Sequence, residues 1–243
     1  MKQPYGFLDS VLRHQRAGEH LADIDRIIGD FRAAPRDVGS YVEVEAGRPF
    51  SEFELRDLPI PHEIPIRVGE MIYNLRASLD YTIRALSWHD TGVQPHGRGE
   101  TGLQFLIEST KEGFEGKRGR SLKGLCVEHV ALVESYQPYQ GCDWAGVLAD
   151  LSNMDKHRHF SVLAGHFNPS TSEWSGTIDP KPEAVPDESG LYDLRDVNME
   201  AYGTFDVAFM EPPHLVSETL KDLQAQVREL LRRFWQEFTL HPV

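Results

Sequence analysis

Three long stretches of this chain repeat apolar residues at intervals of three and four, which is the spacing of one face of an α-helix. They span about residues 7–31, 66–88 and 214–238. In the last stretch the apolar stripe consists of Leu220, Leu223, Val227, Leu230, Phe234 and Phe238. Stripes of this length are buried most readily against one another, so the pattern predicts a bundle of long helices.

Shorter segments complete the expected fold. Two further helices are predicted at about 121–136 and 143–156, the second beginning at Asp143, which suits an N-cap. Alternating segments typical of strands lie at about 41–45, 52–56, 160–164, 173–178 and 204–210. Because no repeat or linker divides the chain, we predict a single domain over residues 1–243. Its class is α+β, mainly α: a bundle of four to five long helices with a small antiparallel sheet.

Composition argues against several functions. The chain has 25 Lys and Arg against 38 Asp and Glu, and its net charge of −13 disfavours nonspecific binding to nucleic acids or anionic membranes. The Gly-rich basic run from Lys117 to Lys123 favours a solvated loop. No segment approaches the roughly 20 apolar residues of a membrane span, so a cytoplasmic protein is expected. No phosphate-binding glycine loop, nucleophile elbow or dinucleotide fingerprint is present, so no cofactor is expected.

A polar cluster marks the end of the helix predicted at 143–156. Asn153 and His157 are four residues apart, and so are Asp155 and His159. Each pair has the spacing of metal ligands on a helix, if the helix extends through His159. Further ligand candidates, by residue type only, are Glu128, His129 and His166.

The same cluster also has readings that need no metal. Asp155 precedes Lys156 and Arg158, so it can pair with either cation or orient the imidazole of His157. The cluster is therefore interpreted as a structural clasp of buried salt bridges, as a metal-free polar site or as a metal site.

The helix predicted at 66–88 carries two sets of polar residues. Arg76, Asp80 and Arg84 are spaced by four and can form a ladder of ion pairs on one face. Asn74 and Tyr81 share another face beside the apolar stripe. Polar groups next to a buried seam need partners, so both side chains are expected to form hydrogen bonds with another helix. The helix predicted at 143–156 is the candidate partner.

Four segments of the chain resemble a broad set of uncharacterised bacterial proteins. Residues 68–81 match a helix of that set, and Asn153 to Arg158 match its later Asn-x-Asp-Lys-His-Arg run. Residues 105–107 match a Phe-Pro-Ile-like segment, and Gln137 to Tyr139 match a Gln-Pro-Tyr segment. The helix of that set commonly reads Arg-Ser-Ala-Leu-Asp-His. This sequence is similar to the Arg-x4-6-His motif of HEPN-type helical domains, many of which are metal-independent ribonucleases.

The resemblance implies roles for particular residues. Arg76 would be the arginine that binds phosphate, whereas the histidine position is occupied by Tyr81. Tyrosine is a poor general base at neutral pH, so His157 would have to supply the acid–base chemistry, with Asp155 beside it. Lys156 and Arg158 would hold phosphate together with Arg76, in a phosphate-bearing ligand or RNA, and the other expected binding residues are Asn74, Tyr81 and Asn153.

Three functions follow from these patterns. The first is a non-catalytic binding or interaction module, in which polar residues lock the helix packing. Apolar faces of the terminal helices would then meet a second subunit in a homodimer. The alternative is a HEPN-like metal-independent ribonuclease or nucleotide-binding protein that uses Arg76, Asp155 and His157. The second alternative is a metal-dependent enzyme built on Asp155, His157 and His159.

Overall fold

The computed structural model describes residues 6–33, 40–43, 54–55, 60–97, 101–157, 162–167, 173–175, 191–193, 200–202, 205–209 and 214–240. The chain forms two compact units, whereas the sequence predicts one domain. Unit 1 consists of Met1–Asp25, Glu63–Ser161 and Ser217–Val243, and unit 2 of Arg26–His62 and Val162–Val216. The strands of the described residues belong to unit 2 and pair with one another.

The predicted helical class is confirmed. The helices are α1 (Phe7–Ala33), α2 (Glu63–Thr91), α3 (Lys111–Ser121), α4 (Val127–Ser135), α5 (Asp143–His157) and α6 (Val216–Leu240), with a 3-10 turn, η2, at Pro138–Gln140. None of the helices in the described ranges combines the length and hydrophobicity that a membrane span requires.

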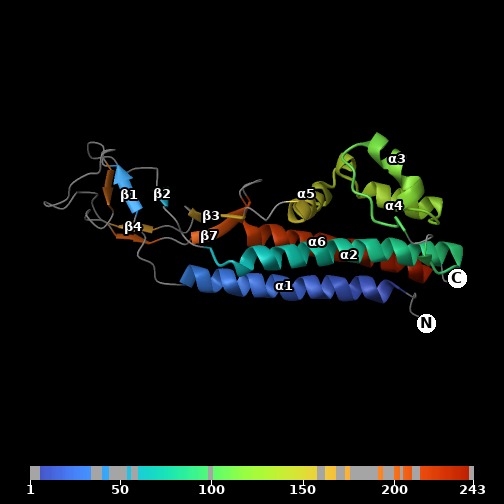
Figure 1. Ribbon diagram of the computed structural model, residues 1–243, viewed down its shortest axis with the longest axis horizontal. Coiled ribbons are helices and arrows are strands. Elements are labelled where there is room, and N and C mark those ends of the chain that lie inside the picture. The colour runs from blue at the N-terminus through green and yellow to red at the C-terminus, as the bar shows by residue number, and fades with distance from the viewer. Residues whose placement is uncertain are drawn as a thin grey trace. The chain divides into compact units, whose positions relative to one another are not determined.

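Helix α1 as far as Asp25 lies side by side with α2 and α6 in unit 1, and the three form its framework (Figure 1). The rings of Phe7 and Trp235 lie 5.4 Å apart near one end of the α1–α6 pair, and Asp25 accepts a hydrogen bond from Ser217 near the other. These contacts fix an antiparallel pairing. Helix α2 also runs antiparallel to α1, because Asp23 lies beside Arg67 and Gly6 beside Ala85.

The apolar stripes of α2 and α6 face the core of this framework. Every residue of the predicted α6 stripe is buried, and so are Val68, Ile72, Leu75, Leu79, Ile83 and Leu86 of α2. The stripe of α1 is different near its start, because Leu8 and Leu12 are about half exposed at 50% and 51%. The apolar residues at the start of α1 therefore include some that α2 and α6 do not cover.

Helices α3 and α4 replace the single helix predicted at 121–136. Thr110 caps α3 by accepting a hydrogen bond from the backbone N–H of Gly113, so part of the expected basic loop is helical. Gly124 separates α3 from α4 with a φ of +85°. A Cβ at this position would lie 2.7 Å from Ser87 Oγ. The left-handed turn and the close approach to α2 explain why one continuous helix does not form.

The strands of unit 2 form three separate antiparallel groups. One has the order β2 (Glu54–Leu55), β1 (Ser40–Glu43) and β5 (Leu191–Asp193). The others pair β3 (Val162–Phe167) with β7 (Phe205–Phe209), and β4 (Glu173–Ser175) with β6 (Glu200–Tyr202). The β3–β7 register shifts between Val162 and Ala164, as at a β-bulge.

Candidate functional site

Arg76 and Asp80 of α2 hold the main chain of Phe105. Arg76 Nη2 donates a hydrogen bond to the Phe105 carbonyl at 3.0 Å, and the Phe105 N–H donates to Asp80 Oδ1 at 2.9 Å. The guanidinium and the carboxylate lie 3.6 Å apart. The two side chains therefore satisfy both polar backbone groups of one residue and fasten the segment that contains it to α2.

Gln137 holds the same segment from the side of η2. Its Nε2 donates to the carbonyls of Leu106 at 2.8 Å and Val133 at 3.0 Å, while its Oε1 accepts from the N–H of Glu108 at 2.8 Å. The Gln137 side chain is fully buried. Residues 105–108, named here the clasped segment, are thus bound to α2 and to Gln137.

Three of the four segments behind the bacterial resemblance meet at this place: 68–81, 105–107 and 137–139. The contacts at this place are hydrogen bonds between side chains and the main chain, which stabilise the local fold. In the fourth segment, Asn153 is exposed on α5. Asp155, Lys156 and His157 belong to the end of α5, but their side chains lie outside the described residues, as do Arg158 and His159. The ribonuclease assignment stays a prediction.

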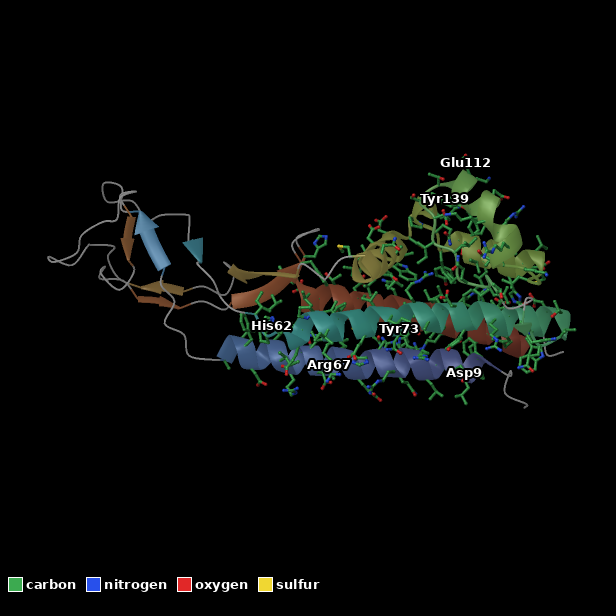
Figure 2. All side chains as sticks on the ribbon, in the orientation of Figure 1. Asp9, His62, Arg67, Tyr73, Glu112 and Tyr139 are labelled. Carbon is green, nitrogen blue, oxygen red and sulfur yellow. The ribbon has the colours of Figure 1, made fainter. Side chains whose placement is uncertain are left out.

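Asn74 and Tyr81 find their partner on α1 rather than on α5. Arg13 Nη1 donates to Asn74 Oδ1 at 3.2 Å, and Asn74 Nδ2 donates to the Glu70 carbonyl at 2.7 Å. The Arg13 guanidinium also lies 5.8 Å from the ring centre of Tyr73 and 5.6 Å from that of Tyr81. Tyr73 lies along the α1–α2 pair in Figure 2. This arrangement joins two helices through a cation between two aromatic rings.

A cluster of His89, Asp90 and His129 joins the end of α2 to the start of α4; His129 is buried and the other two residues are partly exposed. Asp90 Oδ1 lies 3.0 Å from His89 Nδ1, and Asp90 Oδ2 lies 2.7 Å from His129 Nδ1. The backbone N–H of Cys126 donates to Asp90 Oδ2 at 2.7 Å. Burial opposes ionisation of Asp90, but the hydrogen bonds from His129, His89 and Cys126 outweigh it and lower its pKa to about 2.

Sequence reasoning identified only one member of this cluster, His129, and only by its residue type. His89 and Asp90 are adjacent at a helix end, a pattern without recognisable ligand spacing. His129 lies 39 residues after Asp90, so the three meet only because the chain doubles back through α3. The only sign of this cluster in the sequence is the adjacent His89 and Asp90 at the end of a predicted helix.

An apolar groove with a volume of about 680 Å³ lies between the start of α1 and the second half of α6. It is lined by Phe7, Leu8, Val11, His14, Arg228, Glu229, Leu231, Arg232, Trp235 and Gln236. Trp235 is 39% exposed, and Leu8 is among the α1 residues that the helical framework leaves uncovered. The groove is therefore a solvent-facing apolar surface made by the two terminal helices.

The groove is also lined by polar side chains, among them His14, Arg228 and Arg232. His14 Nε2 donates to the Gln224 carbonyl at 3.0 Å, and Gln224 Nε2 returns a bond to the His14 carbonyl at 3.1 Å. Burial lowers the pKa of His14, and the nearby charge of Arg228 lowers it further. The hydrogen bond to Gln224 acts in the opposite direction. Arg232 lies 3.8 Å from Glu229. Arg228 forms no ion pair within the described part of the chain.

Comparisons with protein-family models, curated proteins and solved structures gave no match to this chain. The functional argument therefore depends on the geometry of its own residues.

Proposed function

We propose that this protein is a non-catalytic binding module whose groove between α1 and α6 binds a small amphipathic molecule with an apolar chain and an anionic head group. The observation that carries the proposal is an open apolar groove with an arginine at its edge, Arg228, that has no carboxylate partner among the described residues.

The size and lining of the groove support the apolar part of the ligand. Small-molecule sites in proteins usually have volumes of about 300–1,000 Å³ and are mostly apolar with a few placed polar groups. The groove volume of about 680 Å³ falls within this range. Contacts to Leu8 and Trp235, which are 50% and 39% exposed, would remove hydrocarbon from water, with a gain of roughly 25 cal/mol for each Å² of apolar surface buried.

The charges at the groove support an anionic head group. The whole chain has a net charge of −13, yet the groove presents Arg228 and Arg232 against the single carboxylate of Glu229. An arginine can donate two parallel hydrogen bonds to a carboxylate or phosphate. His14 has a lowered pKa and is therefore neutral at pH 7, so the arginines supply the positive charge.

Calorimetric titration with dodecanoate, below its critical micelle concentration, tests this proposal. We expect saturable binding at one site per chain and weaker binding of dodecanol, which has the same chain without the charge. Arg228→Gln should weaken dodecanoate binding about tenfold, the loss expected for one charge-assisted hydrogen bond, and leave dodecanol binding unchanged. Lys111→Gln, which removes an exposed cation on α3, is the matched control and should bind as the wild type does.

Two results would overturn the proposal. One is the absence of saturable dodecanoate binding to folded wild-type protein. The other is a dimer by light scattering that Leu8→Glu dissociates, since the groove would then be covered by a second copy of the chain. A parallel incubation with RNA addresses catalysis: we expect intact RNA, and cleavage that His157→Ala abolishes would instead establish the ribonuclease.

A further inference from the structure

We propose that His89, Asp90 and His129 form a binding site for a divalent transition-metal ion, with zinc as the ion that fits best. This site is separate from the groove and from the Asp155–His159 segment in which the sequence predicts metal ligands.

The donor atoms already lie at the separations that a metal site needs. One potential ligand atom from each of the three residues lies within 4.8 Å of the others. Ligands that surround zinc tetrahedrally at bond lengths of about 2.0–2.2 Å are roughly 3.4 Å apart. The His89 Nδ1–Asp90 Oδ1 distance is 3.0 Å and the His129 Nδ1–Asp90 Oδ2 distance is 2.7 Å, so each imidazole nitrogen lies somewhat closer to one carboxylate oxygen than two ligands of a zinc ion lie to each other.

The kinds of donor atom indicate which metal is bound. Two imidazole nitrogens and one carboxylate oxygen suit zinc and its neighbours in the first transition row, whereas calcium and magnesium require sites made almost entirely of oxygen. On coordination, the metal takes the place of the Nδ1 proton of each imidazole, and in the neutral ring that proton moves to Nε2. The positive charge of the ion then replaces the two N–H groups that face Asp90.

Hydrogen bonding and burial hold the proposed ligands in position. The N–H of Cys126 fixes Asp90 Oδ2, as hydrogen bonds outside the ligand set commonly orient a metal-binding carboxylate. The side chains of Asp90 and His129 are each only 6% exposed, so the ligands hold their positions before the metal arrives. Water can complete the coordination, as it does in zinc sites that have three protein ligands.

Metal stoichiometry in the intact protein is the first test. Protein stripped with a chelator is loaded with Zn²⁺ or Co²⁺, passed through a desalting column and measured by elemental analysis. We expect one ion per chain, an increase in the unfolding temperature, and the intense visible absorption of tetrahedral Co²⁺. Wild-type protein that is folded by circular dichroism and retains neither ion would overturn the proposal, whatever the variants do.

Variants then assign the ligands. His89→Gln, Asp90→Asn and His129→Gln should each abolish retention of the metal, whereas His96→Gln, which removes an exposed histidine outside the cluster, should retain one ion per chain. His89 has the most exposed side chain of the three, so its variant is the least disturbing to the fold. Retention of the metal by folded His89→Gln and Asp90→Asn proteins would contradict the assignment.

Discussion

The side chain of Gln137 forms hydrogen bonds with the main chain of the clasped segment, as a neighbouring β-strand would. It donates to the Leu106 carbonyl and accepts from the Glu108 N–H. The sequence contains the residues involved, and the bacterial resemblance picks out the segments around Arg76, Phe105 and Gln137. It does not reveal that they bind one another. Gln137 and Leu106 are 31 residues apart, and a glutamine has no preference for burial that would indicate such a partner.

Replacing Gln137 by alanine should lower the free energy of unfolding by about 2–4 kcal/mol. The change leaves the Glu108 N–H and the Leu106 carbonyl without a partner in a buried place, and each unsatisfied group costs about 1–3 kcal/mol. Urea unfolding measures the difference. The matched control is Gln140→Ala at an exposed position of η2, which should change stability by less than about 0.5 kcal/mol. Equal effects of the two substitutions would refute the role of Gln137.

Among the elements, α3 is the clearest case in which the sequence pattern did not predict the structure. It contains glycines at positions 113, 116 and 119, and this composition favours a loop. The helix forms because Thr110 caps it and because Phe114 is fully buried beneath it. Burial of one aromatic side chain and a cap outweigh the low helix propensity of the glycines. By contrast, the stripes of α2 and α6 were predictable because their periodicity extends over many turns.

The glycines around α3 should respond to alanine in opposite directions. Gly119→Ala should raise the free energy of unfolding by about 0.5–1 kcal/mol, because alanine favours a helix and its Cβ would meet no atom within 4 Å. Gly124→Ala should lower it by more than about 1 kcal/mol, because φ is +85° and Ser87 Oγ would lie 2.7 Å from the new Cβ. Thermal unfolding of both variants tests the pair, and a shift of the same sign in both would contradict the structure.

For the whole molecule, the sequence predicts the helical bundle but not the division into two units or the groove. Strand β1 pairs with β5 about 150 residues later, and such distant pairing leaves no local pattern. The apolar lining that α1 gives the groove consists of Phe7, Leu8 and Val11, of which Leu8 is left about half exposed. Periodicity identifies these residues as apolar but cannot tell which of them the other helices reach.

The stability of the whole molecule should fall as the pH is lowered through about 6.5. Burial lowers the pKa of His14 and of His20 from the ordinary value of 6.5, so the unfolded chain binds more protons than the folded chain in this window. Proton uptake then favours unfolding. Urea unfolding over a pH series should show this slope, and the double variant His14→Gln, His20→Gln should flatten it. The exposed His96→Gln variant should keep the wild-type slope; an unchanged slope in the double variant would exclude the two histidines as its source.

The antiparallel pairing of α1 with α6 has a consequence for synthesis on the ribosome. Helix α1 ends at Ala33 and α6 begins at Val216, so about 180 residues must be translated between them. At typical rates of roughly 5–20 residues per second, this takes on the order of 10–40 s. During that interval the apolar stripe of α1 has emerged without the helix that will cover it. The nascent chain therefore offers an early, long-lived binding site for chaperones, which disappears only when α6 leaves the exit tunnel.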